Sequence, residues 1–217
     1  MEIGGRTVHR VGVIDDDEHA RQSYSWAVQD AQLEAVAQND PIVDLARYTD
    51  DLLGRVDAVL CDQHLRVSQF APVDGAQIAA TLYSRGFPAV LCTRWENSAH
   101  LDEIRPFLDR IPVLLSWEDL EPERLLMSLE ITIAELTGTF APHRRPYRTQ
   151  ICVVEVEENH VTVEIPGWHS EKFIQLPRKM LPDTIRSTVR AQYRCHAQVN
   201  LEAEDPSTLY FKDWEAA

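Results

Sequence analysis

Short apolar runs alternate with amphipathic stretches through the first 137 residues of the chain. Between the runs, apolar residues recur at the spacing of one helix face. We predict strands at 10–14, 33–37, 58–61, 89–92 and 113–115, and helices at about 18–30, 41–48, 75–85, 98–108 and 119–136. Asp40 and Pro41 suit the N-cap and first turn of the second helix. Strands that alternate with helices and are apolar throughout predict a parallel sheet covered on both faces.

The pattern changes after residue 137. Two prolines, a glycine and small polar residues in 138–147 predict a linker. Beyond it, apolar and polar residues alternate over 149–157, 160–165 and 173–176, and partly over 189–201, which is typical of half-buried strands. We therefore predict one domain over residues 1–137, a linker over 138–147 and a small antiparallel β domain over 148–217.

Acidic and hydroxyl side chains follow three of the predicted strands. Asp15, Asp16 and Asp17 come after the first strand, Asp62 after the third and Thr93 after the fourth. Carboxyl ends of parallel strands meet in the crevice where open α/β sheets bind ligands. Crowded carboxylates repel one another, and a hard divalent cation such as Mg²⁺ relieves that repulsion. The sequence therefore predicts a metal-assisted acidic pocket with a hydroxyl nearby.

With these residues at these positions, residues 8–137 resemble the CheY-like receiver domain of two-component response regulators. The resemblance implies that Asp62 is the phosphoacceptor. It also implies that Mg²⁺ is held by Asp15, Asp16, Asp62 and the backbone carbonyl of His64, and that Thr93 is the switch hydroxyl. The predicted fold class is α/β: a (βα)5 doubly wound parallel sheet followed by a small mainly-β domain.

Two departures from the family's pattern concern charge and loop length. Ser116-Trp117 stands where the family has Lys-Pro. A phosphoaspartate adds about two negative charges, so the lost lysine needs a substitute. Ser116 can donate a hydrogen bond but carries no charge. Arg94, next to Thr93, would either supply the missing positive charge or cover the pocket and block a phosphodonor. The stretch 63–73 is also longer than the family's usual loop.

Composition bears on the partners of the chain. The formal net charge is −14, and residues 1–140 hold 24 of the 35 acidic residues but 11 of the 21 basic ones. This bias argues against a nucleic-acid surface in the first part. In the second part, the sequence shows no pair of helices joined by a Gly turn, so the usual helix-turn-helix element that reads DNA is not predicted there. A β-type DNA-binding output stays open there, because one face could be lined by Arg144, Arg145, Arg148, Arg178, Lys179, Arg186, Arg190 and Arg194.

The expected location is the cytoplasm. No apolar run reaches the roughly 18 residues of a membrane span, and the first residues lack the apolar core of a signal peptide. The four cysteines are scattered without metal-site spacing, which suits buried thiols in a reducing compartment.

Three classes of function follow. The first is an atypical response regulator, phosphorylated by a histidine kinase or another signalling protein and acting on an unknown protein through its β domain. The second is a phosphorylation-independent pseudo-receiver that serves as an adaptor. The third is a haloacid-dehalogenase-like phosphohydrolase with Asp62 as nucleophile. Such enzymes place an Asp-x-Asp directly after the first strand, where Asp62 does not lie, and keep a lysine, so we expect no enzyme and no catalytic residues. The resemblance further implies a homodimer through the fourth helix, fifth strand and fifth helix.

Overall fold

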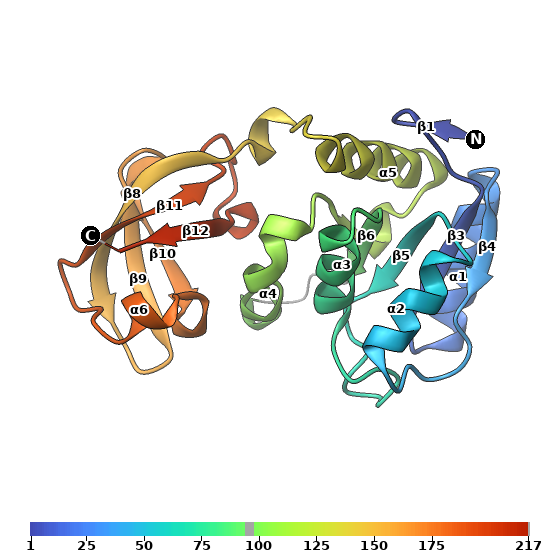
Figure 1. The fold of residues 1–217 in the computed structure, drawn as a ribbon, viewed down its shortest axis with the longest axis horizontal. Coiled ribbons are helices and arrows are strands. Elements are labelled where there is room, and N and C mark those ends of the chain that lie inside the picture. The colour runs from blue at the N-terminus through green and yellow to red at the C-terminus, as the bar shows by residue number, and fades with distance from the viewer. Residues whose placement is uncertain (94–97, 217) are drawn as a thin grey trace. The chain divides into compact units, whose positions relative to one another are not determined.

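The computed structural model describes residues 1–93 and 98–216, which form two compact units (Figure 1). Of the described residues, 1–93 and 110–140 make up the first unit, and 98–109 and 141–216 make up the second. Within these ranges, no helix is both long enough and apolar enough to cross a membrane.

A five-stranded parallel sheet forms the centre of the first unit. Its strand order is β4-β3-β5-β6-β7. The strand β3, which comes first in the predicted domain, therefore lies between β4 and β5. Ile14 pairs with Cys61 and Asp62 pairs with Cys92, which brings the carboxyl ends of the three central strands together. The predicted parallel sheet is confirmed. The strands are β3 (Arg10–Ile14), β4 (Glu34–Ala37), β5 (Ala58–Asp62), β6 (Ala89–Thr93) and β7 (Leu114–Ser116).

Helices cover both faces of this sheet. Apolar residues of α1 and α5, among them Val28 and Leu129, join the strands in one core. On the other face, Leu52 of α2 lies beside Gly12, and the start of α3 lies against Cys61. An N-terminal hairpin that the sequence did not predict adds Ile3 to the first core. These elements are β1 (Glu2–Ile3), β2 (Arg6–Thr7), α1 (Glu18–Asp30), α2 (Leu45–Leu53), α3 (Gly75–Ser84), η2 (Trp117–Asp119) and α5 (Pro122–Leu136).

The second helix begins later than predicted. It starts at Leu45, and its N-cap is Asp44, whose carboxylate accepts the N–H of Arg47 at 3.1 Å. The prediction of a helix from Pro41 was wrong; there, the N–H of Ile42 donates to the carbonyl of Phe70 at 2.6 Å. This contact draws the residues before the helix to the loop that follows β5.

The second unit is built on an antiparallel sheet of strand order β10-β9-β8-β11-β12. Its inward residues form a core of their own, with Val163, Leu176 and Cys195 almost fully buried. The predicted mainly-β second part is confirmed. The elements are α4 (Ser98–Ile104), η1 (Arg105–Arg110), η3 (Pro142–Arg144), β8 (Tyr147–Val156), β9 (His160–Ile165), β10 (His169–Pro177), η4 (Arg178–Met180), α6 (Asp183–Arg186), β11 (Arg194–Val199), η5 (Pro206–Thr208) and β12 (Phe211–Glu215).

Part of the segment predicted as a linker is folded into this second unit. Arg144 is only 4% exposed, and its carbonyl accepts the hydroxyl of Tyr210 at 2.6 Å. Tyr147 already pairs with Val199 in the sheet. Residues 98–109, which the sequence placed in the first domain, also pack with the second unit.

Candidate functional site

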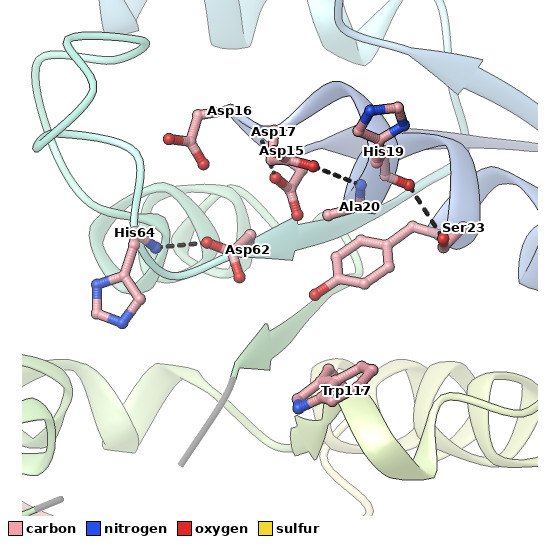
Figure 2. Close-up of a pocket in the computed structure, with 10 residues that line it drawn as sticks. Asp15, Asp16, Asp17, His19, Ala20, Ser23, Asp62, His64 and Trp117 are labelled. Carbon is pink, nitrogen blue, oxygen red and sulfur yellow. Dashed lines mark hydrogen bonds between the residues drawn. The ribbon is translucent and has the colours of Figure 1, made fainter. Parts of the chain in front are cut away.

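A cavity of about 440 Å³ opens at the carboxyl edge of the parallel sheet (Figure 2). The strand ends supply Asp15, Asp16 and Asp62, so the structure brings together the acidic residues that the sequence singled out. Trp117 lies across the cavity from the aspartates. The full lining is Asp15, Asp16, Asp17, His19, Ala20, Ser23, Tyr24, Asp62, His64 and Trp117.

Asp15 is the most buried carboxylate of the site, with 3% of its surface exposed. Its side chain accepts the N–H of Asp17 at 2.8 Å. Burial, followed by the charge of Asp62, raises its pKa from 3.8 to about 7. The nearby Arg21 donates to the backbone carbonyl of Asp15 at 2.6 Å. Asp15 is therefore held in a place where its negative charge is costly.

Asp62 ends β5 with its side chain half-buried at the edge of the sheet. Its Oδ2 accepts the backbone N–H of His64 at 2.6 Å (Figure 2). Burial raises the pKa of Asp62, and the backbone N–H groups of His64 and Gln63 oppose that rise. These bonds hold the carboxylate in a fixed direction, which a nucleophile requires.

The three consecutive aspartates have different surroundings. The carboxylate of Asp17 caps α1 by accepting the N–H of Ala20 at 2.8 Å. Asp15 is buried and Asp16 is half-buried. The helix that Asp17 starts presents His19 and Tyr24 to the cavity. The sequence pattern did not single out these residues, although they lie in the first two turns after the three aspartates.

The long loop after β5 is a packed structure that supports Asp62. Gln63 is fully buried, its side-chain oxygen accepts the N–H of Ala76 at 3.0 Å, and its carbonyl accepts that of Gly75 at 2.9 Å. Arg66 forms an ion pair with Asp74 at 3.2 Å. The loop is thereby tied to the start of α3, which fixes the backbone on both sides of the acidic residue.

Thr93 lies at the end of β6, beside Ser116 of β7. The threonine is 1% exposed, and its hydroxyl makes no hydrogen bond to any residue that the structure describes. Buried hydroxyls without a partner are rare. Thr93 itself is not among the residues that line the cavity.

The two candidate substitutes for the lysine stand differently. The hydroxyl of Ser116 accepts the N–H of Glu118 at 3.3 Å and caps η2. Arg94 lies outside the described residues. No Lys or Arg is among the described residues that line the cavity; His19 and His64 are its only side chains there that can become positive.

Trp117 contributes its ring to the cavity wall and is 43% exposed. The turn η2 begins directly after β7 and keeps this residue at the edge of the sheet.

The donors of the pocket fit Mg²⁺, which prefers carboxylate oxygens. Within the described residues, no group of three or more His, Cys, Asp or Glu side chains is arranged as a complete metal site. Mg²⁺ does not need one, because it usually keeps several waters and takes one or two carboxylates. A divalent cation beside Asp15 would offset the charge of Asp62, which helps to raise the pKa of Asp15.

The strand order 2-1-3-4-5 is that of doubly wound folds of the flavodoxin and CheY type, which bind ligands at this edge. The first unit has the receiver fold. No protein-family model matches the chain, and no curated protein matches its sequence.

Several solved structures are similar to this chain. A putative response regulator from Chloroflexus aurantiacus J-10-fl is 16% identical with a TM-score of 0.45, over 59% of this chain and 99% of that one. A response regulator receiver domain protein from Clostridium thermocellum is 12% identical with a TM-score of 0.46, over 60% and 98%. A sensor protein from Polaromonas sp. JS666 is 15% identical with a TM-score of 0.44, over 59% and 98%.

Proposed function

We propose that the first unit is a signalling receiver in which Asp62 accepts a phosphoryl group. The observation that carries the proposal is the position of Asp62, oriented by the N–H of His64 in an open cavity and facing a second, buried carboxylate. An oxygen of Asp62 attacks the phosphorus of the donor. The bond from phosphorus to the donor's leaving atom breaks, and its electron pair departs with the leaving group.

The residues of the pocket divide the remaining tasks. Asp15 and Asp16 would hold Mg²⁺, which when bound would offset negative charge in the pocket. The buried hydroxyl of Thr93, which lies outside the cavity lining, would donate a hydrogen bond to the new phosphoryl group. Because no Lys or Arg lines the cavity among the described residues, we expect the modified form to depend on Mg²⁺ more strongly than in a receiver that has the lysine.

The partners belong to the same proposal. A histidine kinase or another signalling protein would donate the phosphoryl group, and the second unit would contact a protein target. Three of the eight basic residues considered for a DNA-binding face are otherwise engaged, since Arg144 is buried, Arg148 pairs with Glu215 at 2.7 Å and Arg186 pairs with Asp183. The protein would pass on a signal rather than turn over a substrate.

A phosphorylation-independent pseudo-receiver is the second candidate. Ser116, which occupies the lysine position, uses its hydroxyl to cap η2. The charge of a phosphoaspartate would then be offset by fewer groups than the family provides. In this reading the fold serves as an adaptor, and the second unit binds its partner regardless of the state of Asp62.

Acetyl phosphate separates the two candidates. With Mg²⁺ we expect intact-mass spectrometry to detect one added phosphoryl group, which is absent with EDTA and absent in Asp62→Asn. Asp57→Asn is the matched control, because Asp57 lies at the opposite end of β5, where its carboxylate accepts the N–H groups of His9 and Arg10. An unmodified wild-type protein, beside a receiver that is modified under the same conditions, would favour the pseudo-receiver.

A further inference from the structure

Residues 98–109 connect two strands of the first unit in the sequence but pack with the second unit. The segment contains α4 and most of η1. Three side-chain contacts within the second unit hold it, and each joins a different part of the segment to a different part of that unit.

The first contact is a buried guanidinium. Arg105 is 5% exposed, and its Nη1 donates to the carbonyls of Pro206 at 3.0 Å and Leu209 at 3.2 Å. Burial lowers the pKa of Arg105, and the charges of Asp102 and Asp205 oppose that change. Withdrawing this side chain would leave two carbonyls without their donor, so separation of the helix is costly.

The second and third contacts lie on either side of Arg105. Asp102 meets Nε2 of His160, the first residue of β9, at 2.9 Å. Further along, Nη1 of Arg144 donates to the carbonyl of Leu108 at 2.9 Å, and its guanidinium lies over the ring of Tyr210 at 4.5 Å. The segment is therefore held at its beginning, middle and end.

We propose that residues 98–109 are a captive element of the second unit, and that a change at the acidic pocket reaches the second unit through them. In the sequence, only residues 94–97 stand between Thr93 and α4. A shift of Thr93 toward a new phosphoryl group would pull on the segment 98–109, which is bonded to β9, to η5 and to the start of the second unit. The capture stands on the contacts above, and only the origin of the signal rests on the proposed function.

The capture has a consequence for self-association. The resemblance to receivers implied a homodimer through the fourth helix, fifth strand and fifth helix. In this chain Ile104, Arg105 and Leu108 are buried, and Arg105 is bonded within the second unit. These residues are used inside one chain, so we expect no dimer that needs them.

Native-state hydrogen exchange of the full chain tests the capture. Amides of 101–108 should open with the same urea dependence as those of β8, β9 and β11, and not with those of β3, β5 and β6. Two matched variants sharpen the comparison, since Val163 of the second core and Val90 of the first are both fully buried. Val163→Ala should speed exchange in 101–108 roughly tenfold or more, and Val90→Ala should leave it unchanged. The capture would be overturned if amide exchange in 101–108 became faster in Val90→Ala, or if it became faster in neither variant.

A second arm tests the transmission. After acetyl phosphate and Mg²⁺, exchange in β11 and β12 should change at least about twofold, and the change should be lost in Arg105→Met. Intact mass is recorded in parallel, and Arg124→Met, on the exposed side of α5, is the control. A modified wild type without any change in the second unit would overturn the transmission. An unmodified wild type would refute the proposed function and the transmission and leave the capture, which the first arm decides.

Discussion

Replacing Asp15 with asparagine should make the first unit more stable at pH 8 in the absence of Mg²⁺. Asp15 is a buried acid whose pKa lies at about 7 in the folded chain, above its ordinary value of 3.8. The folded state then binds the proton more tightly, so stability present at low pH is lost as pH rises from about 4 through 7. At pH 8 the cost amounts to a few kcal/mol, because each pH unit of pKa difference is worth about 1.4 kcal/mol. Asparagine keeps the acceptor for the N–H of Asp17 and removes the charge.

Urea denaturation at pH 5 and pH 8, with EDTA or with Mg²⁺, measures this effect. The wild type should lose stability between the two pH values, while Asp15→Asn should change much less. Asp16→Asn is the matched control, since Asp16 is half-buried in the same cavity. Mg²⁺ should restore stability to the wild type at pH 8. An Asp15→Asn protein less stable than the wild type at pH 8 would contradict the account of this carboxylate.

Gly75→Ala should destabilise the first unit by at least about 3 kcal/mol and abolish modification of Asp62. A Cβ built on Gly75 would lie 1.8 Å from the backbone carbonyl oxygen of Asp62 and 3.0 Å from Sγ of Cys61. Backbone atoms cannot move aside as a flexible side chain does. The alanine must therefore push α3 and the end of β5 apart, which displaces the carboxylate from the N–H of His64.

Gly54→Ala is the control for this prediction. Gly54 follows α2 in a right-handed helical conformation, and the nearest atom to an added Cβ is a carbonyl oxygen at 3.7 Å. This variant should unfold within about 1 kcal/mol of the wild type. Thermal unfolding and intact mass after acetyl phosphate report both effects. A Gly75→Ala protein of wild-type stability and reactivity would show that the close approach does not constrain the site.

The central strands and the convergence of the acidic residues could be predicted from the sequence. Each apolar run predicts a buried parallel strand, which must be apolar. The polar residue that follows it, Asp15, Asp62 or Thr93, predicts where that strand ends at the edge of the sheet. The start of α1 was equally local, since Asp17 caps the helix that follows it. The sequence was sufficient to predict an element where neighbouring residues alone determine its structure.

The errors arose where distant segments decide. Asp40 and Pro41 form a good helix start, but the helix begins at Leu45, and Ile42 bonds instead to Phe70, far along the chain. The membership of residues 98–109 depends likewise on Arg105 reaching Leu209. No periodicity within the helix reveals such partners.

The chemistry of the pocket was predicted only in part. Residue identity gave the carboxylates, but whether Ser116 replaces the lysine depended on the direction of its hydroxyl, which caps η2. The position of Trp117 at the cavity wall depended on the same turn. Arg94 lies outside the described residues, and its role as a substitute cation stays a prediction.

Borohydride reduction after treatment with acetyl phosphate and Mg²⁺ tests the central claim most directly, because it converts the acyl phosphate of an aspartate into homoserine at that residue. Peptide mass spectrometry then reads which aspartate was modified. The account predicts homoserine at position 62 and at none of positions 15, 16 and 17. Homoserine at one of those three, or at no aspartate of the chain, would contradict it.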